Sequence, residues 1–180
     1  MNPSLKMKLD LHVHAFEAMG FIAPSVESVG KLVKQIKQRG LDGIAVTEHH
    51  DKRYGMQAKE IAEQYFDSVL IIPGREVDEG INQVVELFLP NGSMFRFVAH
   101  PRYLGSLKID GRVQGIEVKN ALHAGEINEE KVREIARQHN LMLMQNSDAH
   151  YLSDIGQFYN EVALEDLYAR ALPPAQDKGI

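Results

Sequence analysis

Residues 9–14 read LDLHVH, an apolar alternation that carries one aspartate and two histidines. Side chains along a β-strand point alternately to opposite faces, so we expect Asp10, His12 and His14 on one face and the intervening apolar residues on the other. One face of this strand therefore suits a buried core, and the other suits a bound ligand or metal.

The composition is that of a soluble globular protein. The chain has 180 residues, of which 44% are hydrophobic, and a formal net charge of -5. This length suits one domain, which we place at residues 1–171, followed by a flexible tail at 172–180 that contains prolines and a glycine. The acidic balance makes nucleic acid an unlikely partner, and no apolar run is long enough to span a membrane.

The absence of cysteine and the sequence of the first residues indicate the compartment of the protein and the kinds of metal ligand it can offer. The chain has no cysteine, and its start lacks the apolar stretch of a signal peptide. We therefore expect a cytoplasmic protein in which any metal is held by imidazole and carboxylate groups.

Short apolar runs alternate with amphipathic helical runs along the chain. Helices are predicted at residues 25–38, 56–65 and 128–139, with Ser25 and Asn128 as N-caps. Strands are predicted at residues 7–13, 43–47, 69–73, 84–89, 95–99, 115–118 and 141–145. This alternation predicts an α/β protein built of βα units around a parallel sheet or barrel.

Polar residues of the kinds that bind metals lie at or near the carboxyl ends of these strands. In chain order they are His12, His14, Glu48, His49, Glu76, His100, Glu117, Asp148 and His150. In a barrel of parallel strands, the carboxyl ends form the face where ligands bind. We therefore expect these residues to converge on one pocket.

Paired histidines carry more weight than single ones. A lone histidine is more often a hydrogen-bonded or surface residue than a ligand, so we leave His123 and His139 out. The pair His12 and His14 would repel one another if protonated, and would be unsatisfied if buried neutral without partners. The DAH at residues 148–150 repeats the same spacing on another strand. A bound metal resolves this conflict, and the two pairs therefore predict a metal site.

The motifs resemble those of the PHP (polymerase and histidinol phosphatase) superfamily of metal-dependent phosphoesterases. In the family's order they are DLHVH at 10–14, TEH at 47–49, the glutamate of GREV at Glu76, AHP at 99–101, IEVKN at 116–120 and SDAH at 147–150. The resemblance covers the chain to about residue 155. It implies a distorted, TIM-barrel-like (β/α)7 barrel with a metal site at the C-terminal ends of the strands.

The resemblance also implies two to three divalent metal ions. The implied ligands are His12, His14, Glu76 and Asp148 for one metal, Glu76 and His100 for a second, and His49 and His150 for a third. The chain departs from the family in two segments. A few residues after His14, members with three metals have a segment resembling YSDG that supplies a further ligand, whereas this chain has AFEAMG, in which Glu17 is the possible extra ligand. The strand after the bridging glutamate often carries a histidine, whereas NQVVELF has none, which leaves Glu86 as another possible ligand.

Nitrogen and oxygen ligands without sulfur suit Zn, Mn or Fe. Two adjacent cations can lower the pKa of a bridging hydroxide and hold the oxygens of a phosphoryl group during attack. On this interpretation the catalytic residues are Glu76, Asp148 and Arg102.

Neighbouring charged residues have supporting roles. The candidates for binding phosphate are Arg102, Lys119 and Arg75, each close to a motif residue. We expect Asp10, Glu48 and Glu117 to orient ligand histidines, as metal sites commonly require.

Three functions remain in competition. The preferred one is hydrolysis of a small phosphorylated metabolite, a phosphomonoester such as a nucleotide or an amino-alcohol phosphate. The second is metal-dependent hydrolysis of a carbon–nitrogen or carboxylic ester bond, which similar barrels also support. The third is a non-catalytic PHP module. The sequence indicates no oligomeric state.

Overall fold

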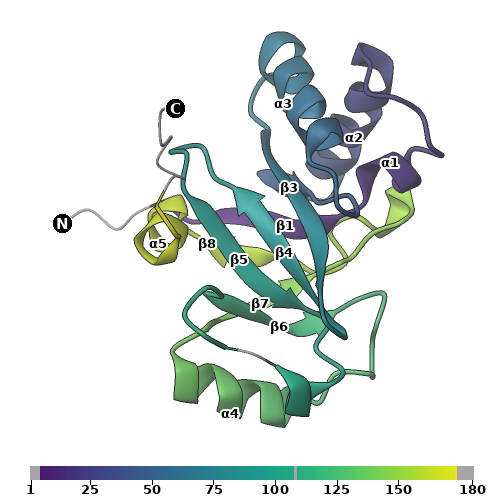
Figure 1. Cartoon of the computed structure of the whole chain (residues 1–180). Helices are drawn as coiled ribbons and strands as arrows, with labels where there is room; N and C mark the ends of the chain where they lie inside the picture. The colour runs from purple at the N-terminus through teal and green to yellow at the C-terminus, as the bar shows by residue number, and fades with distance from the viewer. Residues whose placement is uncertain (1–4, 108, 174–180) are drawn as a thin grey trace, which may run out of the picture.

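The computed structural model describes residues 5–107 and 109–173, which form one mixed sheet with helices packed against it (Figure 1). The strands are β1 Met7–Val13, β2 Gly43–Val46, β3 Leu70–Glu79, β4 Asn82–Phe88, β5 Met94–Ala99, β6 Gly115–Asn120, β7 Met142–Asn146 and β8 Asn160–Val162. The helices are α1 Ala15–Ala18, α2 Val26–Gln38, α3 Arg53–Tyr65, α4 Glu129–His139 and α5 Leu164–Arg170, with short 3-10 turns η1 Leu104–Ser106 and η2 Leu152–Asp154.

The predicted helix starts are confirmed at two places. The Ser25 hydroxyl accepts a hydrogen bond from the Ser28 backbone N–H, and the Ser28 hydroxyl accepts one from the Ser25 backbone N–H, which forms a capping box before α2. Asn128 likewise caps α4 through its side chain. Helix α3 begins at Arg53 rather than at residue 56, because the Asp51 carboxylate accepts the Arg53 backbone N–H and supports an earlier first turn.

The strands are arranged in the order β7-β6-β5-β4-β3-β2-β1-β8. The pairs β1–β2, β2–β3, β5–β6 and β6–β7 are parallel. The strand β4 runs antiparallel to both β3 and β5, and β8 runs antiparallel to β1. The α/β, barrel-like fold class is therefore confirmed, but the expectation of parallel βα units throughout is wrong for β4 and β8.

A tight turn explains why no helix separates β3 from β4. The two strands pair from Gly74 opposite Leu87 to Glu79 opposite Asn82, so only two residues connect them. The first of these, Gly80, has a φ of +70°, which two-residue hairpin turns require and which glycine adopts without strain. The glycine in DEGIN was the signal for this hairpin. As a result β3 extends beyond the predicted end at residue 73 and includes Glu76.

Side-chain amides link the two ends of the sheet order into a nearly closed barrel. The Asn160 amide nitrogen donates to the carbonyl oxygens of Leu9 and Gln145, at 3.3 and 3.0 Å, and to Asn146 Oδ1 at 2.8 Å. Asn146 Oδ1 also accepts the Leu11 backbone N–H at 2.9 Å. These bonds join β7 to β1 and β8 where a backbone ladder is lacking.

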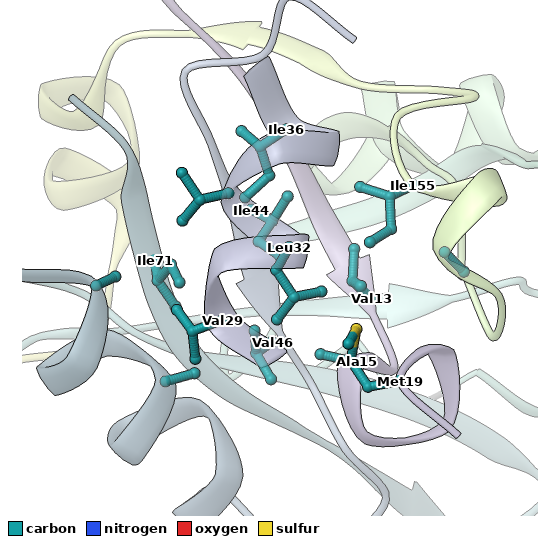
Figure 2. Packing of buried hydrophobic residues seen from close by; sticks show 14 of the residues in the cluster. Val13, Ala15, Met19, Val29, Leu32, Ile36, Ile44, Val46, Ile71 and Ile155 are labelled. Carbon is teal, nitrogen blue, oxygen red and sulfur yellow. The ribbon is translucent and has the colours of Figure 1, made fainter. Parts of the chain in front are cut away.

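Buried apolar residues pack in separate clusters on the two sides of the sheet. One cluster joins α2 and α3 to the sheet through residues such as Leu32, Ile36, Ile44 and Ile71 (Figure 2). A second cluster, which includes Phe95 and many strand residues, lies between the strands and α5, and a third lies under α4. Burial on both sides holds the strands rigidly, so the polar residues at their carboxyl ends are held in place.

The strict alternation expected for residues 9–14 is broken in β1. Leu9 and Leu11 pack in the second cluster, whereas Val13 packs in the first. The pairing register between β1 and β2 shifts between Asp10 and Val13, and such an irregularity changes the face to which later side chains point. Asp10 therefore has different neighbours from the histidines that follow it.

The C-terminal boundary differs slightly from the expectation. Leu172, which we placed in the tail, exchanges two backbone hydrogen bonds with Met94. The rest of the predicted tail, apart from Pro173, lies outside the described residues. Among the residues described, no helix has the length and apolar character needed to cross a bilayer.

Candidate metal centre

All the predicted metal ligands except Glu86 meet at one end of the barrel. They come from β1, from the segments after β2, β5 and β7, and from β3, and we call them the histidine–carboxylate cluster: His12, His14, His49, Glu76, His100, Asp148 and His150. Among the described residues, their donor atoms fall into overlapping groups whose members lie within 4.8 Å of one another. The tertiary structure therefore brings these residues together at one place, as predicted.

Backbone hydrogen bonds bring the two histidine motifs together. The Asp148 backbone N–H donates to the His12 carbonyl oxygen at 2.9 Å, and the His14 N–H donates to the Ala149 carbonyl oxygen at 3.0 Å. Asp148 Oδ1 then lies 3.4 Å from His12 Nε2 and 3.3 Å from His14 Nε2. These three residues form the most deeply buried candidate group.

Glu76 lies at the middle of the cluster. One of its oxygens, Oε1, is 2.9 Å from His100 Nε2 and 3.5 Å from His12 Nε2. The other, Oε2, is 3.1 Å from His49 Nδ1 and 3.7 Å from His14 Nε2. A carboxylate that faces different histidines through its two oxygens has the arrangement of a bridging ligand.

A third group contains His14, His49, His150 and Glu17. The ring centroids of His49 and His150 lie 4.4 and 4.3 Å from that of His14 and 6.2 Å from each other. Glu17 Oε2 is 3.9 Å from His150 Nε2. The structure thus places Glu17 where an extra ligand was expected, in the group that is most open to solvent.

His123, which the sequence analysis set aside, also lies at the centre. It forms a fourth candidate group with His100 and Asp148, and its ring centroid is 4.5 Å from that of His100. His123 follows the carboxyl end of β6, so the rule that identified the other ligands also applies to it. The other histidine set aside, His139, is exposed at the end of α4.

Glu86 does not reach the centre. In the β3–β4 pairing Glu76 lies opposite Val85, so Glu86 faces the other side of the sheet. Its oxygens instead bind Arg75 Nε at 2.7 Å and Arg96 Nε at 3.1 Å. The suggested use of Glu86 as a ligand is therefore wrong, and Arg75, which pairs with it, is also directed away from the cluster.

Two ligands have a strained backbone. His100 and Asp148 have φ values of +25° and +55°, in the region that residues other than glycine rarely occupy. Such strain persists only where the surrounding structure enforces it, and it concentrates at functional sites. Both residues lie immediately after a strand, where the turn directs their side chains into the cluster.

Glu117 orients a ligand histidine, as expected. It is fully buried, and its Oε1 is 3.1 Å from His12 Nδ1. A carboxylate beside Nδ1 keeps the proton there and leaves the lone pair on Nε2, the nitrogen that faces the cluster. The other oxygen accepts the His100 backbone N–H at 2.7 Å, so one carboxylate positions two ligand residues.

Asp10 and Glu48 position segments rather than histidine rings. Asp10 accepts hydrogen bonds from Ser147, through both its backbone and its hydroxyl, and from the Gly156 N–H, which anchors the segment that carries Asp148. Burial raises the pKa of Asp10 to about 6. Glu48 accepts the Phe16 N–H at 2.8 Å and so holds α1, and burial raises its pKa to about 7.

The charge balance of the cluster favours a bound cation. Burial acts to raise the pKa values of Glu76 and Asp148, but the surrounding imidazoles outweigh it and hold both values far below the ordinary range. Burial acts to lower the pKa of His12, but the carboxylates of Asp148, Glu117 and Glu76 outweigh it and raise that pKa to about 10. The carboxylates around His12 favour positive charge at this position, and a bound cation would take the place of the proton on His12 Nε2.

The donor set fits a metal. Asp148 Oδ1 is buried and has no hydrogen-bond partner among the described residues, although two imidazole nitrogens lie close to it. A buried anionic oxygen without a partner is costly, and a cation between it and the imidazole lone pairs would satisfy all three atoms. Imidazole and carboxylate donors without sulfur are compatible with a divalent transition metal.

The two remaining phosphate-binding candidates lie at the rim of the site. Arg102 pairs with Glu126 at 3.1 Å, and Glu126 Oε2 is also 3.4 Å from His123 Nδ1. Lys119 lines a small cavity of about 170 Å³ with His123 and has no ion-pair partner among the described residues. Both residues thus adjoin the side of the cluster that contains His123.

Fold and site together define an α/β barrel with a candidate metal centre at one end, and comparison with known proteins finds the same fold and a PHP-associated segment. A family model described as "PHP-associated" matches residues 126–170. An uncharacterised protein of Methanocaldococcus jannaschii is 26% identical over 145 residues, which cover 65% of this chain and 84% of that protein.

Solved structures share the fold. A two-domain protein from Bacteroides vulgatus, described as containing a PHP-like metal-dependent phosphoesterase, matches with a TM-score of 0.61 and 21% identity over 84% of this chain and 54% of its own. This chain therefore spans about half the length of that protein. A protein from Bifidobacterium adolescentis, described as a metal-dependent phosphoesterase, matches with a TM-score of 0.67 and 14% identity over 92% of this chain and 96% of its own.

A third solved structure, an amidohydrolase from Chromobacterium violaceum, matches with a TM-score of 0.60 and 16% identity over 95% of this chain and 99% of its own. At these identities the structures establish a common fold. The PHP-associated segment and the shared fold together confirm the resemblance to the PHP superfamily that the motifs predicted, and they support a metal-dependent hydrolase.

Proposed function

We propose that this protein is a metal-dependent phosphoesterase that hydrolyses a small phosphomonoester. The observation that carries the proposal is the sharing of ligands between neighbouring groups. His12, His14, His100 and Asp148 each belong to two of the candidate groups, so cations held by adjacent groups would lie side by side. Adjacent cations suit phosphoryl transfer, in which charge on several oxygens must be neutralised at once.

The residues of the chain would divide the work as follows. We assign His12, His14, Glu76 and Asp148 to one metal, and Glu76 with His100 to a second. His49 and His150 would serve a third, and His123 and Glu17 extend the second and third groups respectively. Bound divalent ions would supply Lewis acidity and activate water for attack on phosphorus.

Side chains of the protein itself orient the candidate ligands and neutralise charge in the cluster. Glu117 holds His12 in the tautomer that presents a lone pair to the cluster, and Glu76 balances the charge between its two sides. Arg102 would bind a phosphoryl oxygen at the rim, where it now pairs with Glu126. A substrate phosphate that approached the cluster would compete with Glu126 for this guanidinium group.

The test combines metal analysis with two substrate panels. Purified protein, and protein reconstituted with Zn, Mn or Fe, would be analysed for metal content and then assayed with phosphomonoesters and with carboxylic esters and amides. We expect at least one metal ion per chain and metal-dependent release of inorganic phosphate. Metal-dependent cleavage of esters or amides alone would establish the alternative hydrolase. Tight metal binding without any turnover would favour a non-catalytic module.

A further inference from the structure

A cavity of about 520 Å³ opens beside the histidine–carboxylate cluster, and three aromatic rings line it together with charged and polar side chains. The rings come from Phe16 on α1, Phe21 in the following loop and Tyr54 on α3. Phe16 lies edge-on to Phe21 with centroids 5.3 Å apart, and its centroid is 5.6 Å from that of Tyr54. We call this space the aromatic cavity.

The aromatic cavity is continuous with the candidate metal centre. His49 and Glu17 line it, and both belong to the group that also contains His14 and His150. A phosphoryl group bound at the cluster would therefore have the cavity next to it. The group on the far side of the ester oxygen could occupy this space.

Two features indicate that the cavity is suited to a ligand rather than being ordinary packing. Phe21 is 65% exposed and Phe16 is 36% exposed, although both could bury their rings against an apolar group. Tyr54 is only 9% exposed, and its hydroxyl has no hydrogen-bond partner among the described residues. Buried tyrosine hydroxyls normally have a partner, so this hydroxyl is an unsatisfied polar group on a residue that lines the cavity.

The charges of the lining restrict what could enter. Burial, with the charge of Glu48, raises the pKa of Tyr54 to about 12, so its hydroxyl remains a hydrogen-bond donor. Glu17 and Glu48 contribute carboxyl groups, while Arg53 at the rim is already paired with Asp51 at 2.7 Å. A second anionic group in the cavity would meet the carboxylates of Glu17 and Glu48, so the occupant should carry no negative charge there.

We propose that the aromatic cavity binds the alcohol part of the substrate and selects phosphomonoesters whose alcohol carries an uncharged aromatic ring near the ester oxygen. This inference rests on the proposed phosphoesterase function and names its substrate class. Hydrolysis of such an ester breaks the phosphorus–oxygen bond to the alcohol and forms one to the oxygen of water, and a proton from that water goes to the released aromatic alcohol.

The first experiment compares benzyl phosphate with ethyl phosphate on the metal-loaded protein. Both are esters of primary alcohols, so the preference reports chiefly on binding of the ring. We expect kcat/KM to be at least tenfold higher for benzyl phosphate, because the ring leaves water for an apolar surface. Phe21→Ala should reduce this ratio severalfold. Tyr65→Ala, which removes an equally exposed ring outside the cavity, should leave both the ratio and the activity unchanged.

The second experiment measures binding without turnover, with benzylphosphonate and ethylphosphonate titrated into the same metal-loaded proteins. We expect tighter binding of benzylphosphonate, and a smaller difference in Phe21→Ala. Equal hydrolysis and equal binding of the two compounds would overturn the aromatic cavity while leaving the phosphoesterase function intact. Preferential binding of benzylphosphonate without hydrolysis of any phosphate ester would support the cavity and refute the proposed function.

Discussion

Replacement of Glu117 by glutamine tests how the cluster is oriented. The Oε1 atom of Glu117 faces His12 Nδ1 at 3.1 Å and accepts from Asn146 Nδ2 at 2.8 Å. Its Oε2 atom accepts from the His100 N–H at 2.7 Å and from Asn120 Nδ2 at 2.9 Å. Glutamine has nearly the same volume but offers only one accepting oxygen. In either orientation its NH₂ group therefore faces two donors from which the carboxylate oxygen had accepted hydrogen bonds.

The expected losses follow from these contacts. Two buried donors without partners cost about 1–3 kcal/mol each, so Glu117→Gln should lower the free energy of unfolding by about 2–6 kcal/mol. His12 could relieve part of this cost by moving its proton from Nδ1 to Nε2. That tautomer removes the lone pair that faces the cluster, so metal affinity should fall by about 10–100-fold.

Urea unfolding and metal titration of the folded protein would measure the two effects. Glu86→Gln is the matched control, because Glu86 is also buried and pairs with Arg75 and Arg96 but lies on the other side of the sheet. We expect the control to lose stability and to keep its metal affinity. The reasoning would be refuted if the metal affinity of Glu117→Gln stayed within about threefold of wild type, or if Glu86→Gln lost as much metal affinity as Glu117→Gln.

The other predictions concern the ligands and the rim. Glu76→Gln should abolish most phosphatase activity while the fold is retained, because it removes the charge between the two sides of the cluster; near-normal turnover with full metal content would exclude a bridging role. Arg102→Ala should mainly raise KM, with a smaller fall in kcat, and steady-state kinetics showing an unchanged KM would move the phosphate contact to Lys119. His123→Ala should weaken one class of metal site by at least about tenfold in a titration, whereas the exposed His139→Ala should not, and equal behaviour of the two variants would remove His123 from the centre. Affinity for the metal that His12 ligates should rise with pH between pH 6 and 8, by up to about tenfold per pH unit, because the raised pKa of His12 means that this metal must displace a proton; calorimetry in buffers of different ionisation enthalpy that detects no proton release would contradict this.

The sequence was sufficient to identify most of the candidate ligands, because the spacing that identifies them spans only a few residues. The spacing of His12 and His14, and of Asp148 and His150, places each pair close together on adjoining backbone whatever the rest of the chain does. The rule that residues after parallel strands converge then brought the pairs together, and the structure confirms that proximity. His123 obeyed the same rule and was missed, because a single histidine in a loop has no partner nearby in the sequence.

Strand direction was harder to foresee. A run such as that of β4 has the same apolar pattern whether it lies parallel or antiparallel to its neighbour, and only the glycine turn at Gly80 distinguishes the two. This choice determines the side of the sheet on which Glu86 lies. The antiparallel pairing sets it opposite Arg75, on the face away from Glu76.

The sequence by itself determined the α/β alternation, the caps of α2 and α4 and most members of the histidine–carboxylate cluster, because helix caps, hydrophobic periodicity and the spacing of the paired residues act over a few residues. Only the tertiary structure decided which carboxylates face the histidines and which hold segments in place. Asp10 and Glu117 look alike in the sequence, yet one anchors the segment after β7 and the other orients His12. That difference depends on contacts between residues more than a hundred positions apart, and such contacts exist only once the barrel has formed.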